Sequence, residues 1–540
     1  MKAVALLLLL SIQLAARLAP AATVNCAGAD LSKITSAVYV VPEGSDNNTC
    51  GSQPGSACKT IHQGIKNCKG EGCSVLVRWG TYNLSASLEL ADGVNLYGSC
   101  VFEGADHKYR SMILGRPAIR ANNINKPTTL HGFVIIGTTA ASPGEASIAM
   151  LISNSKGLTL RQDVVVSGRG ADGSNGAYAD GATGQNGFGA TGNVGGAGGR
   201  ACASNPPAGS TGFGGRGADH NNVYTWGRGV LAKCKTNNVS ESLGKAGEKS
   251  GAVSGGGGGG RGGAGCMCDP NDGNSGDGPS GGEGNPGQCG VTGGKPNSNN
   301  KGAFSGTAWI AVRGDSGAIG QVGSGGGGGG SGGYAVYVPI WLWEPLKDFN
   351  GRPGGGGGGG GCGGPGGQGG QQGGASIPIE LFNSSLIGLA GANVLIPGPG
   401  GRGGNGAIGG KGGPGGQGVQ GRKGVKEHFD AALACEGWGP GYGGKGGNGG
   451  QGGAGSGGAG GNGGPSFGIA LVNSPPLPGT GVAIYPAQPG AGGSRGAGGH
   501  NGGSQCKGAD GENGVSGFSD NNNSIVSFTS TGQPLEGAEQ

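Results

Sequence analysis

Residues 401–424 read GRGGNGAIGGKGGPGGQGVQGRKG and carry a strict three-residue glycine period. From Gly400, a glycine stands at every third position up to Gly424, while the positions between vary among Arg, Asn, Ala, Ile, Lys, Gln and Val. Extended backbone with three residues per turn is the polyproline II geometry. The period therefore predicts ordered extended runs. A flexible glycine linker is the alternative, although it gives no reason for a constant phase.

Collagen has the same glycine period, but it needs proline or hydroxyproline at about 15–20% of its positions. The tract after Gly400 has almost no proline following its glycines. We therefore expect polyglycine-II-like runs, in which glycine lets neighbouring backbones approach and hydrogen bond while the other side chains point outward. At about 3.1 Å per residue, such runs project tens of ångströms.

A ten-residue unit recurs between the glycine tracts: ASIAMLISNS (146–155), ASIPIELFNS (375–384) and PSFGIALVNS (465–474). Its third, fifth and seventh positions are apolar, the two-residue period of a strand with one buried face. Each copy ends in Asn-Ser, and asparagine suits a bend because it tolerates left-handed backbone and can form ladders along stacked turns. Segments 307–314 and 334–341 are interpreted as degenerate copies.

Units that bury a core only when they stack are typical of a solenoid. We predict an all-β fold, a right-handed parallel β-helix whose coils carry long glycine-rich excursions packed as a second layer. The expected parts are a signal peptide (1–21), a Cys-rich cap with the first coils (22–135), and coils interleaved with glycine tracts (136–540). The tracts are 168–200, 251–300, 323–333, 354–374, 398–424, 439–464 and 490–517.

Four features follow one another after Ala37. They are an extended run (Val38 to Val41), a turn (Ser45-Asp46), a helix cap (Lys59-Thr60-Ile61) and a first coil (Gly80-Thr81-Tyr82). This order resembles the opening of secreted β-helix proteins of the pectin-lyase-like superfold, over roughly the first 130 residues. The glycine tracts resemble the bundles of snow-flea antifreeze protein and of phage tail-tip adhesins, and mycobacterial PGRS repeats. The mycobacterial N-terminal module is absent.

The N-terminus is typical of a secretory signal peptide, with Lys2, an apolar core at 3–10 and a small-residue cleavage site at Ala19-Pro20-Ala21. We therefore expect a secreted or cell-surface protein, and no later segment reaches membrane-spanning length. Fourteen cysteines in an exported chain indicate disulfides. The candidates are Cys26, Cys50, Cys58, Cys68, Cys73, Cys100, Cys266 and Cys268.

Three groups of residues are candidates for binding. Aromatic side chains gather in one stretch and could stack on sugars, anchor a partner or fill the scaffold: Tyr334, Tyr337, Trp341, Trp343 and Phe349. Arg313-Gly314-Asp315 spells a tripeptide that some integrins read. Calcium is the one candidate cofactor, with Asp269, Asp272 and Asp277 as ligands or as a solvated turn.

The sequence offers no G-x-S-x-G elbow, no phosphate-binding loop and no adjacent Asp pair. A formal charge of +5 is scattered singly among glycines, which disfavours nucleic acid as a partner. We predict a non-catalytic adhesin or matrix protein that presents loops to an extracellular polysaccharide or cell surface and can self-associate. The alternatives are a polysaccharide lyase or hydrolase, implied by the superfold, and, third, an ice-binding protein.

Overall fold

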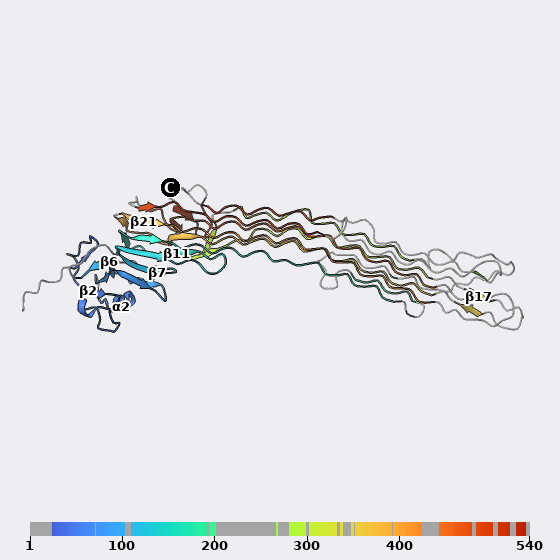
Figure 1. Ribbon diagram of the computed structural model, residues 1–540, viewed down its shortest axis with the longest axis horizontal. Helices are drawn as coiled ribbons and strands as arrows, with labels where there is room; N and C mark the ends of the chain where they lie inside the picture. Colours follow the sequence, from blue (N-terminus) through green and yellow to red (C-terminus); the bar gives the residue numbers. More distant parts are fainter. Residues whose placement is uncertain are drawn as a thin grey trace, which may run out of the picture.

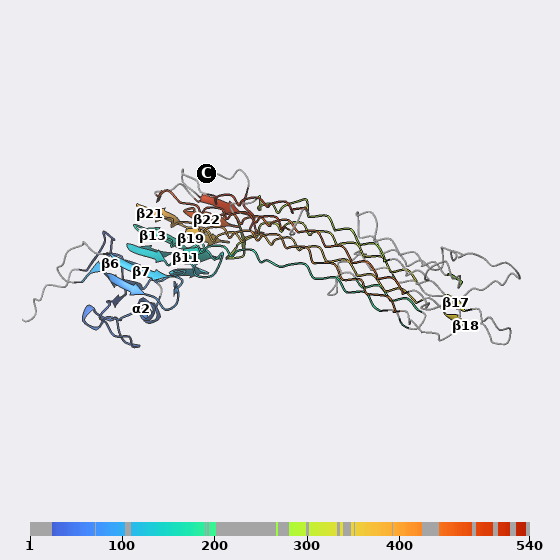
Figure 2. The same ribbon diagram turned by 45° about the vertical axis from the view of Figure 1, so that its right-hand side comes forward.

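Parallel sheets gather at one end of the molecule, and glycine-rich runs extend from them side by side as a long bundle (Figure 1, Figure 2). The regular structure is almost all β-strand, which confirms the all-β class. The computed structural model describes residues 24–70, 72–102, 110–189, 191, 194–200, 216, 266–267, 280–298, 302–331, 335–337, 347–349, 352–390, 392–423, 442–477, 482–500, 506–518 and 525–535. The predicted signal peptide lies outside these residues.

Most strands belong to three sheets. The first sheet contains β2 (Ala37–Val40), β3 (Ser74–Arg78), β6 (Asn95–Val101), β9 (Thr128–His131), β12 (Leu158–Arg161) and β20 (Gly388–Ala390), with β1 (Asn25–Cys26) beside β6. The second contains β4 (Gly80–Asn83), β7 (Ser111–Gly115), β10 (Phe133–Gly137), β13 (Val164–Val166), β21 (Asn393–Ile396) and β23 (Val482–Ile484). The third contains β5 (Leu88–Glu89), β8 (Ile119–Asn122), β11 (Ser147–Ser153), β19 (Ser376–Phe382), β22 (Ile469–Val472) and β24 (Ile525–Phe528).

The chain visits the three sheets in a constant order. Strands β6, β7 and β8 enter the first, second and third sheet in turn, and β9, β10 and β11 repeat the cycle one strand further along. All strand pairs in these sheets are parallel except β1 with β6. Each cycle therefore lays one strand on each sheet.

The ten-residue repeat forms neighbouring strands of the third sheet, as its periodicity predicts. Its apolar positions line up in register, with Met150 beside Ile379 and Ile379 beside Ile469. These side chains are fully buried in the core that the three sheets share. Because each copy alone exposes an apolar face, stacking the copies supplies the core.

The asparagines that end the repeat form the expected ladder. Asn154, Asn383 and Asn473 adopt left-handed backbone, with φ of 49°, 48° and 47°. The Nδ2 group of Asn383 donates to Oδ1 of Asn154 over 3.3 Å, and Asn473 donates to Asn383 in the same way. The amide ladder therefore fixes the bend at which each copy leaves the third sheet.

A disulfide-rich cap precedes the stacked strands. The short helix α2 (Ile61–Asn67) follows a single 3-10 turn (Pro54–Ser56), and Thr60 caps the helix by accepting from the N–H of Gln63. The six predicted cap cysteines are all paired: Cys26–Cys100, Cys50–Cys58 and Cys68–Cys73. No helix in the described ranges is long and apolar enough to cross a bilayer.

The two segments interpreted as degenerate repeats do not join the stacked sheets, so this interpretation is wrong. Strand β16 (Ala308–Ile310) forms an antiparallel hairpin with β15 (Ala303–Ser305). Strand β17 (Ala335–Tyr337) pairs with β14 (Cys266–Met267) and β18 (Lys347–Phe349) in a separate small sheet. Phe304 of the hairpin packs edge-on against Phe528 with ring centroids 4.8 Å apart, so this hairpin covers the seam between sheets and bundle.

Every long glycine-rich excursion leaves the sheets at the same corner. The chain departs after a strand of the second sheet and returns to a strand of the third: from β13 to β19, from β21 to β22 and from β23 to β24. In the cycle before these, residues 138–146 make the same connection between β10 and β11 directly. The excursions therefore begin in register and lie side by side.

One glycine run, residues 443–464, lies at the centre of the bundle, and we call it the central run. Its backbone hydrogen bonds directly to six other runs: 281–294, 315–330, 355–373, 401–422, 490–499 and 509–515. Those six also bond to one another around a closed ring: Gln321 N to Gln288 O, Gly320 N to Gly364 O, Gly413 N to Cys362 O, Gly406 N to Ser494 O, Gly511 N to Gly496 O and Ala509 N to Gly290 O. The packing is therefore hexagonal.

Two details of the predicted architecture are corrected. The bundle projects away from the sheet corner instead of covering a sheet face as a second layer (Figure 1), because all excursions leave at one corner and bond to each other. The run predicted to begin at residue 323 is already in the bundle at Gly314, whose N–H donates to the Gly370 carbonyl over 2.9 Å.

A disulfide that the sequence did not single out joins Cys289 of run 281–294 to Cys506, three residues before run 509–515. The chain-entropy model predicts that removing a long-range bridge costs more than removing a local one. We expect the double variant Cys289→Ser/Cys506→Ser, which opens a separation of 217 residues, to lose about 5 kcal/mol of unfolding free energy in urea. Cys68→Ser/Cys73→Ser, with a separation of 5, should lose about 2 kcal/mol. Equal losses of unfolding free energy in the two variants would contradict a long-range bridge between Cys289 and Cys506.

Candidate binding site at the base of the glycine bundle

Three outgoing runs form one face of the bundle: 170–188, 400–422 and 490–499. Their register is locked, since Gly173 N donates to the Arg402 carbonyl over 2.8 Å and Gly403 N donates to the Ala491 carbonyl over 2.9 Å. In run 400–422, every third side chain from Arg402 onward is exposed. The face therefore displays side chains in rows that cross all three runs.

Asp and Asn side chains satisfy the backbone along this face. The Oδ1 atom of Asp172 accepts from the Arg402 N–H over 2.7 Å, and that of Asn175 accepts from the Asn405 N–H over 2.8 Å. The Oδ1 atoms of Asp180 and Asn186 accept from the N–H groups of Lys411 and Gln417 in the same way. Each of these acidic or amide residues precedes a glycine whose own N–H donates to the same partner residue. Asx-Gly pairs recurring along the run are the sequence signal of this edge.

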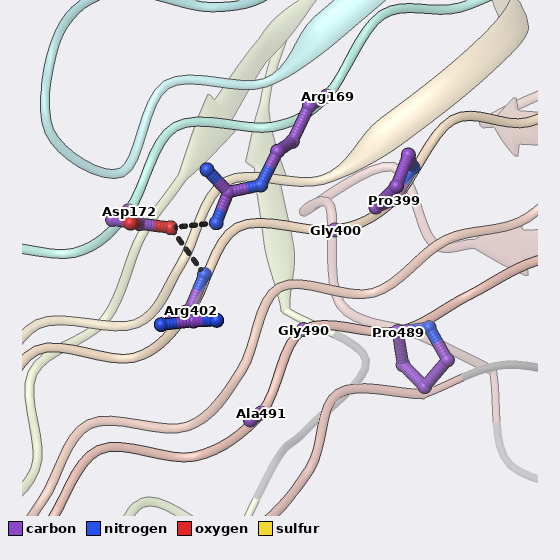
Figure 3. A pocket seen from close by; sticks show the side chains of 8 residues that line it. All are labelled: Arg169, Asp172, Pro399, Gly400, Arg402, Pro489, Gly490 and Ala491. Carbon is purple, nitrogen blue, oxygen red and sulfur yellow. Dashed lines mark hydrogen bonds and ion pairs between the residues drawn. The ribbon is translucent and has the colours of Figure 1, made fainter.

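A hollow of about 410 Å³ opens where the three runs leave the sheets (Figure 3). It brings together residues more than 300 positions apart in the chain: Arg169, Asp172, Pro399, Gly400, Arg402, Pro489, Gly490 and Ala491. Backbone bonds hold its walls, since Gly170 N donates to the Pro399 carbonyl over 3.0 Å and Gly400 N to the Gln488 carbonyl over 2.8 Å.

The charges of the hollow are two guanidinium groups and one carboxylate. Arg169 Nη2 lies 2.5 Å from Asp172 Oδ1, and the two side chains are 41% and 51% exposed. Figure 3 shows the same oxygen bonded to the backbone nitrogen of Arg402 and not to its guanidinium. In the described part of the chain, the Arg402 guanidinium has no hydrogen bond or ion pair. The hollow therefore keeps one uncommitted cationic group.

A second hollow of about 640 Å³ lies at the asparagine ladder and is lined by Lys156, Asn383, Ser384, Ser385, Asn473 and Pro475. Its asparagine amides bond to one another, and the Ser384 hydroxyl donates to the Phe382 carbonyl over 2.7 Å. Most of its polar groups already serve the bend of the chain. The hollow at the bundle base is therefore the stronger candidate for a ligand.

The aromatic residues singled out in the sequence are only partly placed. Tyr337 and Phe349 lie at the ends of β17 and β18, in an antiparallel pair where Ala335 faces Phe349. Tyr334, Trp341 and Trp343 lie outside the described residues. The strand pair stands at the far end of the bundle from the sheets (Figure 2).

The tripeptide at Arg313 to Asp315 is built into the bundle. The Arg313 guanidinium donates to the Ser174 hydroxyl over 2.8 Å and to the Gly369 carbonyl over 3.2 Å. Gly314 is buried, and the Asp315 N–H donates to the Lys295 carbonyl over 2.8 Å. The Arg313 guanidinium is thus bonded within the bundle although the residue is exposed, and Asp315 is exposed as well.

The calcium candidates Asp269, Asp272 and Asp277, and also Cys268, lie outside the described residues, and Cys266 is described only as part of β14. Within the described ranges, Asp46, Cys50 and Cys58 form the one group close enough to hold a metal. The two cysteines are joined in a disulfide, and Asp46 accepts from the N–H groups of Lys59 and Thr60 at 2.8 and 2.9 Å. The Asp46 carboxylate thus holds the backbone that leads into α2, and the two sulfur atoms are committed to the disulfide.

Comparisons with known proteins give little on family. No family model matches the chain, and no curated protein is similar to it. Among solved structures, a rhamnogalacturonan lyase matches with 14% identity and a TM-score of 0.17, over 26% of this chain. The match spans 40% of the lyase chain, so it leaves most of that protein uncovered.

Proposed function

We propose that the three parallel sheets form a right-handed parallel β-helix of the pectin-lyase-like type, in a protein that is exported to the cell surface or beyond. The constant order in which the chain visits the sheets supports the β-helix. The disulfides Cys26–Cys100, Cys50–Cys58 and Cys68–Cys73 support an oxidising, extracellular location.

The protein serves as a non-catalytic adhesive or structural element, in which the β-helix is the base and the glycine bundle is a rigid stalk. The observation that carries this proposal is the hexagonal packing around the central run, residues 443–464. A flexible glycine chain is a poor spacer, since its ends wander as a random coil. Backbone bonds between neighbouring runs remove that freedom and fix the direction of the stalk.

The dimensions support presentation at a distance. Run 400–422 follows the stalk, and at about 3.1 Å per residue it reaches roughly 70 Å from the sheet corner. The strand pair of β17 and β18 stands at the far end of the bundle from the sheets (Figure 2). The stalk thereby holds distal segments well clear of the base, as an extracellular polysaccharide or cell surface requires.

The test uses the full mature protein on beads that carry acidic or neutral polysaccharides and on intact cells, with and without calcium. We expect retention on at least one surface, with no release of reducing or unsaturated sugar ends. Product release that stops on addition of a chelator would replace this proposal with a calcium-dependent polysaccharide lyase. Absence of both retention and product would remove the adhesive role.

A further inference from the structure

We propose that the hollow at the base of the bundle binds the carboxylate or sulfate group of an acidic polysaccharide. This inference rests on the proposed adhesive function and names the chemistry of its ligand. It also assigns the contact to the side of the stalk near the sheets, where Arg169, Arg402 and the two prolines meet (Figure 3).

Arg402 is the group that selects an anion. Its backbone is fixed on both sides, because its N–H donates to Asp172 Oδ1 over 2.7 Å and its carbonyl accepts from Gly173 over 2.8 Å. Its guanidinium, in contrast, is exposed and uncommitted among the described residues. A planar guanidinium presents paired donors that match the two oxygens of a carboxylate or sulfate. The backbone therefore holds a ready donor pair at the hollow.

The carboxylate of Asp172 does not cancel this preference. Its Oδ1 atom lies 2.5 Å from Arg169 Nη2 and also accepts the Arg402 N–H. Asp172 and Arg169 thus neutralise each other locally, and Arg402 supplies the net positive charge. Because the site is exposed, this attraction should weaken as salt rises.

The other groups of the site suit a sugar chain. Pro399 and Pro489 line the hollow with compact apolar rings. One triplet further out, the Oδ1 atoms of Asn175 and Asn405 accept from backbone N–H groups at 2.8 and 2.9 Å, and both side chains are exposed. Each amide is therefore oriented with its Nδ2 donors available for hydroxyl oxygens. Sugar hydroxyls supply such acceptors at every residue of a polysaccharide.

The experiment measures binding of the full mature protein by titration calorimetry to hyaluronate oligosaccharides, dextran sulfate, uncharged dextran and polyglutamate. We expect Arg402→Gln to weaken binding to the preferred acidic polysaccharide at least tenfold, a typical effect of losing a charge-assisted pair. Arg402→Lys keeps the charge but loses the planar fork, so it should restore only part of the affinity. The two acidic polymers distinguish a carboxylate ligand from a sulfate ligand.

Lys411→Gln is the matched control. It removes one positive charge from the same exposed stripe, about 28 Å further along at 3.1 Å per residue. We expect it to keep wild-type affinity, and all variants to keep the wild-type unfolding temperature, because neither side chain bonds to another described group. Selective loss in Arg402→Gln supports the site.

Three results overturn the inference. If Lys411→Gln weakens polysaccharide binding as much as Arg402→Gln does, the affinity depends on the overall positive charge and not on the hollow. Binding of polyglutamate with the same affinity and the same dependence on Arg402 would assign the hollow to acidic proteins. Failure of the wild-type protein to bind either acidic polysaccharide would remove the site, while its retention on neutral polymers or cells would leave the proposed adhesive function intact.

Discussion

Gly452→Ala, which adds a single methyl group to the central run, is expected to lower the free energy of unfolding by about 3 kcal/mol. A Cβ atom at this position would lie 1.8 Å from the Cys362 carbonyl oxygen and 2.4 Å from its carbon. Backbone atoms cannot rotate out of the way as a flexible side chain can. The adjacent run must therefore shift, and its bonds to the rest of the ring shift with it. Urea unfolding, with amide exchange of the bundle, measures the loss.

Gly189→Ala is the matched control, since an added Cβ there meets no atom within 4 Å. Replacing an unstrained glycine by alanine reduces the freedom of the unfolded chain and stabilises by about 0.5 kcal/mol. The two variants should therefore shift stability in opposite directions. If both behave alike, close approach of the runs is not what holds the bundle together.

Glu380→Leu is expected to raise the free energy of unfolding at pH 8, because it removes an unpaired buried polar group, a change worth about 1–3 kcal/mol, and abolishes a pH-dependent cost that adds to it. Glu380 in β19 is fully buried between Leu151 and Ala470 on neighbouring strands, and neither carboxylate oxygen has a hydrogen-bond partner in the described part of the chain. Burial raises the pKa of Glu380 well above its usual value, while Arg120 opposes the rise only partly. The folded protein therefore holds a neutral acid that the unfolded chain would ionise.

The sign of the pH dependence follows from this raised pKa. Below the pKa of the unfolded chain, about 4.3 for glutamate, both states are protonated and Glu380 adds no pH dependence to stability. As pH rises above it, the unfolded state loses its proton first, so stability falls by about 1.4 kcal/mol per pH unit until the folded carboxyl also ionises. Denaturation from pH 4 to pH 9 should show this decline in the wild type and not in Glu380→Leu.

Glu89→Gln provides the control for this titration. Glu89 lies on β5 in the same row of the third sheet but is exposed. Its replacement removes a carboxyl that lies 4.0 Å from Arg120 Nε but leaves the buried Glu380 in place, so stability should still decline from pH 4 to pH 9. A wild-type stability that stays level over that range would show that Glu380 is ionised and solvated in the folded protein.

The strands of the third sheet could be predicted from sequence because both of their constraints are local. A two-residue apolar period selects Met150, Ile379 and Ile469 for the core, and the terminal asparagine marks the bend. The same logic failed for residues 307–314, where Trp309 packs against Phe304 in a hairpin. Short apolar runs fit either arrangement, and only long-range packing separates them.

The position of a glycine run in the bundle, at its surface or at its centre, could also be predicted in part from the sequence. Runs 400–422 and 443–464 both carry two glycines in most triplets, but the third position is larger than alanine throughout 400–422, whereas from Ala454 onward the central run holds only Gly, Ala or Ser apart from Asn462. Fully buried Ala454, Ser456 and Ala459 mark that centre. The size of the third residue in the triplet, in addition to the glycine phase, therefore separates a surface run from the centre of the bundle.

The binding hollow could not be predicted from the sequence. Arg402 meets Asp172 across 230 positions, and the pairing depends on three excursions starting in register at one corner. The Asx-Gly pairs in 170–188 indicate an edge that accepts backbone N–H groups, but they do not name the run that supplies them. Only the assembled lattice brings Pro399 and Pro489 beside the two arginines.

The closed ring around the central run also has a consequence for the order of folding, because its members are synthesised at different times. Residues 281–373 and 401–464 are made first, yet the shell around the central run closes only when 490–499 and 509–515 arrive. Contacts at such sequence separation fold slowly. Before the last excursion is synthesised, the central run lacks two of its six neighbours. Its backbone groups on that side are unpaired and could bond to other chains. Export in an unfolded state, with the Cys289–Cys506 link made last, would spare the cell that exposed intermediate.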